Sequence, residues 1–345
     1  MPEEAAGTTR EPARDVAVIG ASSGGVESLQ GLMRSLPADH RGAVCVVLHL
    51  SAETKSMLPS ILRRAGPLPA VAAEDGMPLE FGRIHVAPND CHLLVEGPSL
   101  RVVHGPKENR HRPAIDPLFR SAAWSFGPRV VGVVLSGNLD DGTAGLWAVK
   151  SCGGTTVVQE PNEALHPEMP TNALMHNRID HRLPLQQIGA LLARLAREPI
   201  NGAVVPTADP QVRSEVDFAE LGGDPEEMFR LGALSPYTCP SCRGALWEIE
   251  QGGHLRYRCH VGHAYSQGTL SLEQDVAIET SLYTALRAVD EKAMSLRRLA
   301  ARWPDPASSV RREYEARAGE LEQTAEQLRQ LLAGNVSRVG SGPTA

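Results

Sequence analysis

Short runs of consecutive apolar residues, many of them β-branched, recur along the first half of the chain. They alternate with segments of helical spacing such as Val26–Ser35 and Leu183–Arg197. The apolar runs predict strands at Val16–Ile19, Val44–Leu48, Arg83–Ala87, Val130–Ser136 and Thr155–Gln159. Runs without polar alternation are typical of parallel strands that are buried on both faces. The alternation of strands and helices therefore predicts an α/β fold, with right-handed crossovers in a doubly wound, mostly parallel sheet.

The pattern changes after residue 197, and the chain divides into segments of different character. Leu270–Arg302 and Pro306–Leu332 are rich in helix-forming residues and are separated by a Pro-containing break, which predicts a helical hairpin with a solvated outer face. We expect six segments: a disordered leader (1–14), an α/β catalytic domain (15–197), a linker (198–235), a zinc-ribbon-like unit (236–268), the helical hairpin (269–333) and a disordered tail (334–345).

Composition narrows the class of protein. The 34 basic and 41 acidic side chains give a net charge of −7, which argues against nucleic acid as the main partner. No stretch of 18 apolar residues exists, and the N-terminus has no apolar signal region. We therefore expect a soluble, cytoplasmic protein that is not embedded in a membrane.

The first predicted strand leads into the turn Gly20–Gly25, which reads GASSGG. A serine between glycines at a strand-to-helix turn exposes its hydroxyl, and the N–H groups of Ser23 and its neighbours lie where an oxyanion or a phosphate is stabilised. Taken alone, such a turn more often indicates nucleotide binding or a plain tight turn. Its spacing, however, matches neither the dinucleotide-binding pattern nor the P-loop.

Two further strand ends carry polar residues. His49 ends a buried strand, where a histidine is either a core-edge residue or a base at the edge of the sheet that binds ligands. Asp140 and Asp141 follow the strand at Val130–Ser136. One of them could cap the helix that begins near Thr143, or the two could bind a divalent cation, although no third carboxylate is placed to help.

Serine, histidine and aspartate at one sheet edge are the groups needed for acyl transfer. The histidine takes the serine proton, and the aspartate fixes the tautomer of the histidine and stabilises the imidazolium. Here the order is Ser, His, Asp, whereas α/β-hydrolases follow the order Ser, Asp, His and carry a GxSxG elbow. An ordinary lipase or esterase fold is therefore disfavoured.

At these residues the sequence resembles the catalytic domain of chemotaxis receptor protein-glutamate methylesterases of the CheB type. The resemblance covers about residues 15–197. The motifs that carry it are VIGASSGG, the strand that ends in Leu48–Leu50, and the segments Ala73–Gly76, Ile84–Pro88, Asn109–Asp116, Asp141–Gly145 and Met169–Pro170.

The resemblance implies a reaction and a set of roles. Ser22 matches the nucleophile, His49 the general base and Asp141 the orienting acid. The reaction it implies is hydrolysis of glutamate γ-methyl esters on chemoreceptor-type helices, with deamidation of glutamine as a second activity. Further residues at matching positions are expected to contribute to the oxyanion or substrate site: Ser23, Gly24, Arg110, His111 and Asn138.

The sequence departs from this family in two ways. Only about 14 residues precede Val16, so we expect a stand-alone form without a phosphorylatable receiver domain. The family pattern T-G-M-G-x-D-G reads SGNLDDG here, with Asn138 in place of Met and Leu139 in place of Gly. The triad is intact, so these changes are expected to affect substrate fit more than chemistry.

A second motif lies beyond the α/β domain. Cys239, Cys242, Cys259 and His263 have the spacing C-x₂-C-x₁₆-C-x₃-H, with a predicted hairpin between the two halves. This is a zinc-ribbon-like ligand set, and four protein ligands indicate a structural rather than a catalytic Zn²⁺. The alternatives are a unit that has lost its metal, or free thiols on a hairpin, with His260 as a competing fourth ligand.

These observations predict a serine hydrolase with no catalytic cofactor, a structural Zn²⁺ and methylated signalling-protein helices as partners. The alternative is a non-catalytic interaction protein that docks on a receptor or signalling partner. We also expect the metal to stabilise only its own unit, because a Pro- and Gly-containing linker should separate that unit from the triad.

Overall fold

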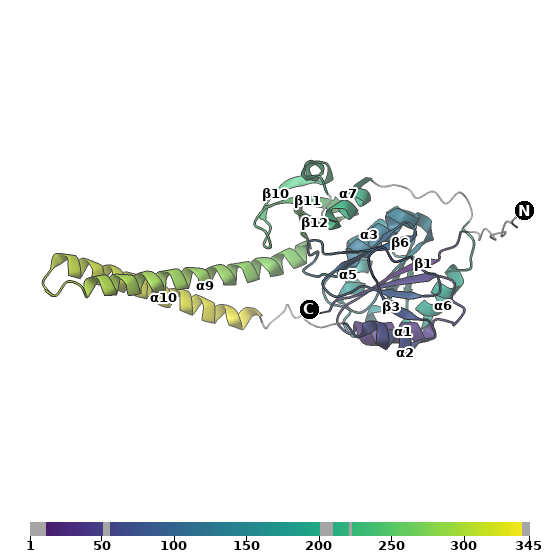
Figure 1. Ribbon diagram of the computed structural model, residues 1–345, viewed down its shortest axis with the longest axis horizontal. Coiled ribbons are helices and arrows are strands. Elements are labelled where there is room, and N and C mark those ends of the chain that lie inside the picture. Colours follow the sequence, from purple (N-terminus) through teal and green to yellow (C-terminus); the bar gives the residue numbers. More distant parts are fainter. Residues whose placement is uncertain (1–11, 51–55, 201–209, 221–222, 340–345) are drawn as a thin grey trace, which may run out of the picture. The chain divides into compact units, whose positions relative to one another are not determined.

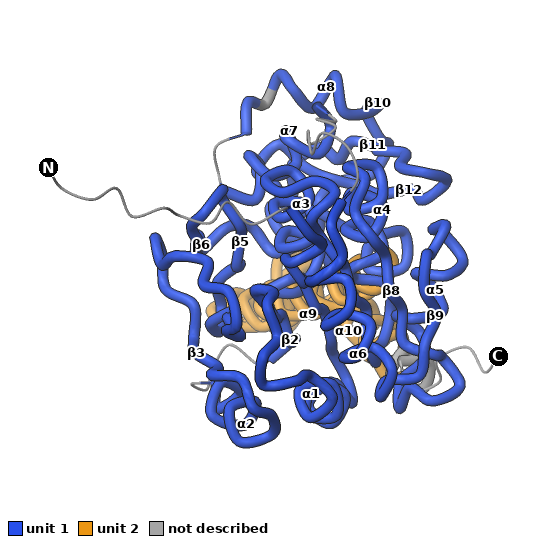
Figure 2. Tube along the Cα trace, turned by 90° about the vertical axis from the view of Figure 1, so that its right-hand side faces the viewer, with its two compact units in different colours: residues 1–270 blue, residues 271–345 orange. Residues whose placement is uncertain are grey.

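The computed structural model describes residues 12–50, 56–200, 210–220 and 223–339. The chain forms two compact units, residues 1–270 and residues 271–345, which are coloured separately in Figure 2. Most of the expected leader and the last six residues of the expected tail lie outside the described residues. Of the rest of the leader, Ala13 is buried and forms a β-bridge with Pro199.

Seven parallel strands form the central sheet of the first unit, in the order β3-β4-β2-β1-β7-β8-β9. The predicted doubly wound sheet is confirmed. All five predicted strands are present, and the two that were not predicted, β3 and β9, are only three residues long. The strands are β1 (Val16–Ala21), β2 (Ala43–Leu48), β3 (Ala70–Ala72), β4 (Ile84–Val86), β7 (Val130–Val134), β8 (Thr155–Gln159) and β9 (His181–Leu183).

Helices cover both faces of this sheet (Figure 1). One face packs against α1 (Gly25–Ser35), α2 (Leu58–Ala65) and α6 (Leu185–Leu195), and the other against α3 (Ile115–Phe126), α4 (Thr143–Ser151) and α5 (Glu168–His176). Successive side chains of β1 alternate between the two resulting cores, as the pleat of a strand requires. Burial on both faces explains why the strands are apolar at every position.

The strand order creates a switch point beside β1. The chain moves from β1 to β2 on one side of the sheet and later places β7 on the other side. Ligands in open α/β sheets bind outside the carboxyl ends of the strands at such a point. Ser22 follows the last residue of β1, so the fold places it at this crevice.

The rest of the first unit contains a hairpin, two short helices and a second sheet. The hairpin is β5 (His92–Glu96) with β6 (Ser99–Val103), and the helices are α7 (Pro210–Ala219) and α8 (Met228–Leu231). The second sheet, which we call the ribbon, is antiparallel in the order β10-β11-β12-β13. Its strands are β10 (Ala233–Thr238), β11 (Ala245–Gln251), β12 (His254–Cys259) and β13 (Ala264–Ser266).

Residues 198–235, the expected linker, contain α7 and α8. Helix α7 packs against α3, and Val212, Val216 and Phe218 are buried. The apolar pattern of α7 is interrupted by Glu215, which is itself fully buried, and this hides the amphipathic periodicity in the sequence.

The second unit consists of two long helices, which confirms the predicted hairpin. Helix α9 (Gln267–Ala300) starts at the end of the first unit, and α10 (Ser309–Val339) continues six residues beyond the predicted end at 333. Ion pairs Arg297–Glu322 and Arg329–Asp290 join the helices along their exposed sides. None of the described helices is long and apolar enough to cross a membrane.

Candidate active site

Three strand ends bring Ser22, His49 and Asp141 together. Ser22 follows β1, His49 follows β2, and Asp141 lies in the loop between β7 and α4. The side chains of His49 and Asp141 are 4% and 2% exposed, whereas Ser22 is partly accessible. A buried base and acid behind an accessible hydroxyl is the arrangement that a serine nucleophile requires.

Hydrogen bonds link the three side chains in series. Nδ1 of His49 lies 3.1 Å from the Ser22 Oγ, and Nε2 lies 2.8 Å from Oδ2 of Asp141. An ionised aspartate can only accept, so Nε2 carries the proton and Nδ1 is the lone pair that faces the serine. This tautomer leaves Nδ1 ready to take the Ser22 proton.

Both oxygens of Asp141 accept several hydrogen bonds. Oδ2 also accepts from the Ile115 N–H at 2.7 Å, and Oδ1 accepts from Asn109 Nδ2 at 2.9 Å and from the Gly142 N–H at 3.0 Å. Burial alone would raise the pKa of Asp141, but the hydrogen bonds and the neighbouring His49 hold that pKa well below its usual range. Asp141 is therefore ionised at neutral pH.

His111 packs against the base. Its ring stacks on His49 with 3.6 Å between centroids and 10° between planes. Burial, and secondarily the proximity of His49, lowers the pKa of His111 to about 3. His111 is therefore neutral at physiological pH, and it offers a flat surface that fixes the ring plane of His49. The substrate contact that we predicted for His111 stays a prediction.

The turn that carries His111 has an unusual backbone. Glu108 and His111 exchange backbone hydrogen bonds, and the two residues between them, Asn109 and Arg110, have φ angles of 47° and 73°. Positive φ at both central positions is the geometry of a type I′ turn. The turn directs Arg110 to the surface and buries Asn109 beside Asp141.

The start of α1 lies next to Ser22. The Ser22 N–H donates to the Ser136 carbonyl at 2.9 Å, and the Gly25 N–H donates to the Ser22 carbonyl at 2.8 Å. The N–H groups of Ser23 and Gly24 are therefore the candidates for holding an oxyanion, aided by the partial positive charge at the helix N-terminus. Gly24 has a φ of 68°, which suits a glycine.

Both departures from the family pattern lie beside this turn. Asn138 is exposed, and its Nδ2 lies 3.2 Å from the Ser23 Oγ. Leu139 has a φ of 64°, a conformation in which a glycine is unstrained. Its N–H donates to Glu168 and its carbonyl accepts from Asn172, and both contacts stabilise the strained turn.

Asp140 faces away from His49. Its Oδ1 accepts a hydrogen bond from the Ser266 Oγ at 2.9 Å. Burial, and then the neighbouring charge of Asp141, raises the pKa of Asp140. The two aspartates therefore point to different partners, which does not favour a shared cation.

The four residues of the Cys/His motif converge. Within the described part of the chain, the one group of three or more potential metal ligands consists of Cys239, Cys242, Cys259 and His263, whose ligand atoms all lie within 4.8 Å of one another. Sγ of Cys259 is 3.6 Å from Sγ of Cys242 and 3.6 Å from Nδ1 of His263. Two ligands about 2.3 Å from a tetrahedral centre lie about 3.8 Å apart, so these separations fit a zinc-sized ion.

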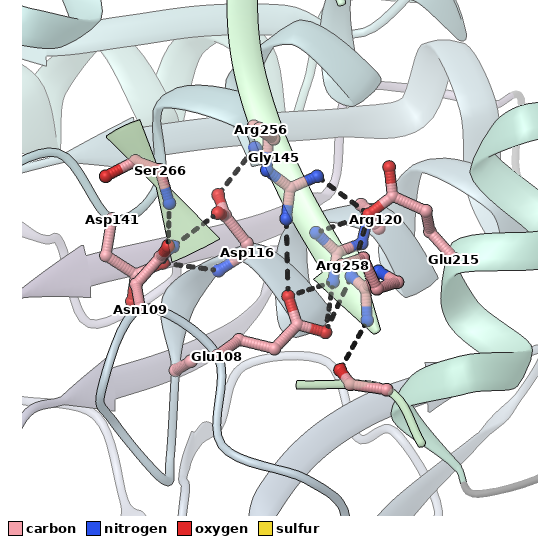
Figure 3. A network of polar contacts seen from close by, with 12 residues as sticks. Glu108, Asn109, Asp116, Arg120, Asp141, Gly145, Glu215, Arg256, Arg258 and Ser266 are labelled. Atoms are coloured by element: carbon pink, nitrogen blue, oxygen red, sulfur yellow. Dashed lines mark hydrogen bonds and ion pairs between the residues drawn. The ribbon is translucent and has the colours of Figure 1, made fainter. Parts of the chain in front are cut away.

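Sequence reasoning missed a group of buried polar residues next to Asp141 (Figure 3). Asn109 and Asp116 lie beside Asp141, and Ser266 of the ribbon donates its N–H to Asn109 Oδ1 at 3.1 Å. Next to them, five charged side chains form a network with at most 2% of each exposed: Glu108, Arg120, Glu215, Arg256 and Arg258. The available signal was the pair Arg256 and Arg258, two residues apart in a predicted strand and therefore on the same face.

These contacts correct one expectation. We expected a linker to separate the Cys/His unit from the triad, and this is wrong, because β13 contacts the residue that holds Asp141. The ribbon buries charged side chains against α7 and against the turn that carries Glu108, so the boundary suggested by composition is not a boundary in the structure.

A mostly parallel α/β sheet with a hydrogen-bonded Ser–His–Asp series at its switch point has the architecture and site geometry of a serine hydrolase. A family model described as CheB methylesterase matches residues 17–192, which is just over half of the chain. The chain belongs to the CheB methylesterase family.

Known relatives match the same region. The chain is 39% identical over 189 residues to protein-glutamate methylesterase/protein-glutamine glutaminase 5 of Anaeromyxobacter dehalogenans, covering 53% of this chain and 51% of that protein. It is 36% identical over 177 residues to protein-glutamate methylesterase/protein-glutamine glutaminase 2 of Rhizobium johnstonii, covering 50% and 48%. The chain thus spans about half the length of these curated relatives.

A solved structure shows the same fold. The crystal structure of the Thermotoga maritima CheB methylesterase catalytic domain aligns with a TM-score of 0.50 at 29% identity, covering 52% of this chain and 98% of that one. The ribbon and the helical hairpin lie beyond the region that the family model matches.

Proposed function

We propose that this protein hydrolyses γ-methyl esters of glutamate side chains in other proteins and that Ser22 is the nucleophile. The observation that carries the proposal is the Ser22–His49–Asp141 hydrogen-bond series at the switch point of a CheB-family sheet. The relatives named above carry the same activity in their names, together with glutamine deamidation.

The geometry supports a two-step acyl transfer. His49 Nδ1 takes the proton as Ser22 Oγ attacks the ester carbonyl, and the N–H groups of Ser23 and Gly24 hold the oxyanion. The C–O bond then breaks, and methanol leaves with the proton from His49. Water attacks the resulting acyl-enzyme by the same route, which releases the glutamate. The same steps on a glutamine amide release ammonia.

We further propose that the substrates are methylated helices of chemoreceptor-type signalling proteins and that the protein works in the cytoplasm. The family membership supports the substrate class. None of the six cysteines, which all lie in the described part of the chain, forms a disulfide bond, and three of them gather in one potential metal site, which supports a reducing compartment. Exposed Asn138 and Arg110 are the proposed substrate contacts.

We also propose that the Cys/His cluster holds one structural Zn²⁺. Cys239, Cys242, Cys259 and His263 would supply all four positions of a tetrahedral site, so the metal would link the two ends of the ribbon hairpin. Thiolate and imidazole donors are the ligands that zinc prefers.

The test is methanol release from purified methylated receptor fragments, with Ser22→Ala as the matched control. We expect release by the wild type and none by Ser22→Ala. Ammonia release from unmethylated fragments would add the deamidase activity. Binding to the fragments without methanol release would contradict the esterase and support a docking protein.

A further inference from the structure

The side-chain amide of Asn109 contacts both the ribbon and the triad. Asn109 is 2% exposed, and its Nδ2 donates to Asp141 Oδ1 and to Asp116 Oδ2, both at 2.9 Å. Its Oδ1 accepts from the Ser266 N–H at 3.1 Å, a donor that also lies 2.8 Å from Thr269 Oγ1. The amide of Asn109 therefore bridges the proposed catalytic acid and the ribbon (Figure 3).

The two ends of this amide are not interchangeable. The Nδ2 end faces the ionised Asp141 carboxylate, so a rotated amide would place its oxygen against an acceptor. The Ser266 N–H favours the same orientation of the amide, because this donor requires an acceptor and therefore the Oδ1 end. Ribbon and triad thus favour one orientation of Asn109.

Strand β13 also holds the backbone of this turn. The Asn109 N–H donates to the Ala264 carbonyl at 2.8 Å, and the Ala264 N–H approaches the Lys107 carbonyl at 3.4 Å. The turn that carries Asn109 therefore pairs with the edge strand of the ribbon.

A buried ion network fixes the ribbon to the catalytic fold beside this contact. Glu108, on the same turn, binds Arg120 of α3 at 2.6 Å and Arg258 of β12 at 3.0 Å. Glu215 of α7 binds Arg256 at 2.7 Å and Arg258 at 2.8 Å. A buried charge that loses its partners is strongly destabilising, so the ribbon does not leave this surface while the protein stays folded.

We propose that the ribbon contributes to the active site. Its Ser266 N–H orients Asn109, a positioning residue that holds the Asp141 carboxylate in place to accept the hydrogen bond of His49. The inference rests on the proposed esterase function. It assigns Asn109 and Ser266 a task at the triad that neither the family match nor the Cys/His motif assigns to them.

The ribbon side of the contact can be tested by a pair of variants at one position. Ser266 lies on the edge strand β13, and its N–H points to Asn109 and Thr269. Ser266→Pro removes this N–H, whereas Ser266→Ala removes only the hydroxyl that contacts Asp140.

The rate of Ser22 phosphonylation by a fluorophosphonate, followed by intact mass, reports nucleophile activation without a receptor. In this step the Ser22 O–P bond forms and the P–F bond breaks, with loss of HF.

We expect Ser266→Pro to slow phosphonylation at least about tenfold more than Ser266→Ala does, because displacements of 1 Å at a catalytic group can cost about 100-fold. Asn109→Gly tests the other end of the contact without altering the ribbon, and glycine suits the positive φ of that position. It should slow the reaction by a similar factor. Arg213→Met removes an exposed ion pair with Asp217 on α7 and serves as the surface control, with an unchanged rate.

The pH profile separates positioning from a general loss of structure. Asp141 faces His49 and lies beside Asp116 and Asp140. The Asn109 hydrogen bond is one of the contacts that lower the pKa of Asp141, so its loss leaves the carboxylate a stronger acceptor, and the acid limb of the phosphonylation rate should move to higher pH in Asn109→Gly. The rate at each pH is divided by the fraction of folded protein at that pH, so that acid unfolding does not move the limb.

The outcomes distinguish this inference from the proposed function. A wild type that reacts no faster than Ser22→Ala overturns both. A reactive wild type overturns the positioning role alone if Asn109→Gly matches its rate, or if the acid limb stays in place or moves to lower pH. Equal rates for Ser266→Pro and Ser266→Ala overturn the part played by the ribbon.

Discussion

The carboxylate of Asp141 is held at both oxygens, which leaves it one orientation. Donors from α3, from the Asn109 turn and from Gly142 surround it, and His49 occupies the remaining direction. Such a preorganised acceptor stabilises the imidazolium as it forms and costs no rearrangement at that moment. The neutral ring of His111 restricts His49 from the other side.

Substitutions in the triad should follow an order. Ser22→Ala should abolish ester hydrolysis with little loss of stability, because a turn serine contributes little packing. Asp141→Asn should cost less than Ser22→Ala or His49→Ala, since the acid orients rather than reacts. The corresponding change in a serine protease costs about 10⁴-fold in kcat. Methanol release measures all three, and an effect of only a few-fold for Asp141→Asn would contradict the assignment of the acid.

Gly137→Ala should lower activity more than stability. A Cβ at this position would collide with Met169 Sδ and would lie 2.8 Å from the Cβ of Ser22. The thioether of Met169 can move aside, whereas the serine turn cannot move without losing its register with His49. We expect at least a tenfold loss of kcat with a nearly native melting temperature. Gly319→Ala, in an open position of α10, is the matched control and should retain full activity.

At the scale of elements, the sequence predicts those features that a local pattern of residues determines. Ser22 and His49 directly follow apolar runs and Asp141 lies in the loop after another, so the sequence placed all three at the edge where the carboxyl ends of parallel strands meet, and the family resemblance implied their roles. Asn109 and Ser266 could not be paired, because 157 positions separate them and their contact depends on how the ribbon docks. Helix α7 was missed for the same reason: Glu215 is polar in the sequence, and its partners lie on other elements, Arg120 on α3 and two arginines on β12.

Glu215→Gln should destabilise the protein strongly. It removes one of two carboxylates that face three buried arginines, which leaves guanidinium charge uncompensated. The expected loss is about 3 kcal/mol in the free energy of unfolding, measured by urea denaturation. Asp217→Asn, on the same helix, removes an ion pair with a half-exposed arginine and should cost less than about 1 kcal/mol. Similar losses in the two variants would contradict the role of the network.

At the scale of the whole molecule, the domain boundaries that composition suggests differ from the boundaries of the compact units. Cys/His content separates residues 236–268 from the α/β domain, yet the first compact unit extends to Leu270 and includes the ribbon. The buried arginines of β12 explain the difference, since their partners lie on α7 and on the Asn109 turn. The helical hairpin, which has its own core and its own ion pairs, does form a separate unit.

Buried neutral histidines should make the protein acid-sensitive. Burial, and then the nearby Arg256, lowers the pKa of His254 to about 4, from a value near 6.5 in the unfolded chain. The unfolded state therefore binds the extra proton first, so this contribution to stability is complete above pH 6.5 and is lost as the pH falls towards 4. Between pH 7 and pH 5 the loss from His254 is roughly 2 kcal/mol. Unfolding titrations of His254→Gln should show a shallower pH dependence than the wild type, and parallel curves would contradict this origin.

Removal of the metal should affect both stability and chemistry. The four-ligand cluster lies in a sheet too small to fold on its own apolar core, so we expect close to one zinc per chain and a lower melting temperature after chelation. The sequence alone suggested that the esterase would survive chelation. Because the ribbon supplies Ser266 to Asn109 and two arginines to the buried network, the structure instead predicts that Ser22 phosphonylation slows as the ribbon loosens.

Cys259→Ser should lose zinc and also slow the reaction, whereas Cys91→Ser, outside the cluster, should retain both the zinc and the rate. Freshly purified protein without metal would contradict the ligand assignment, and full reactivity after zinc loss would show that the ribbon keeps its place without the ion.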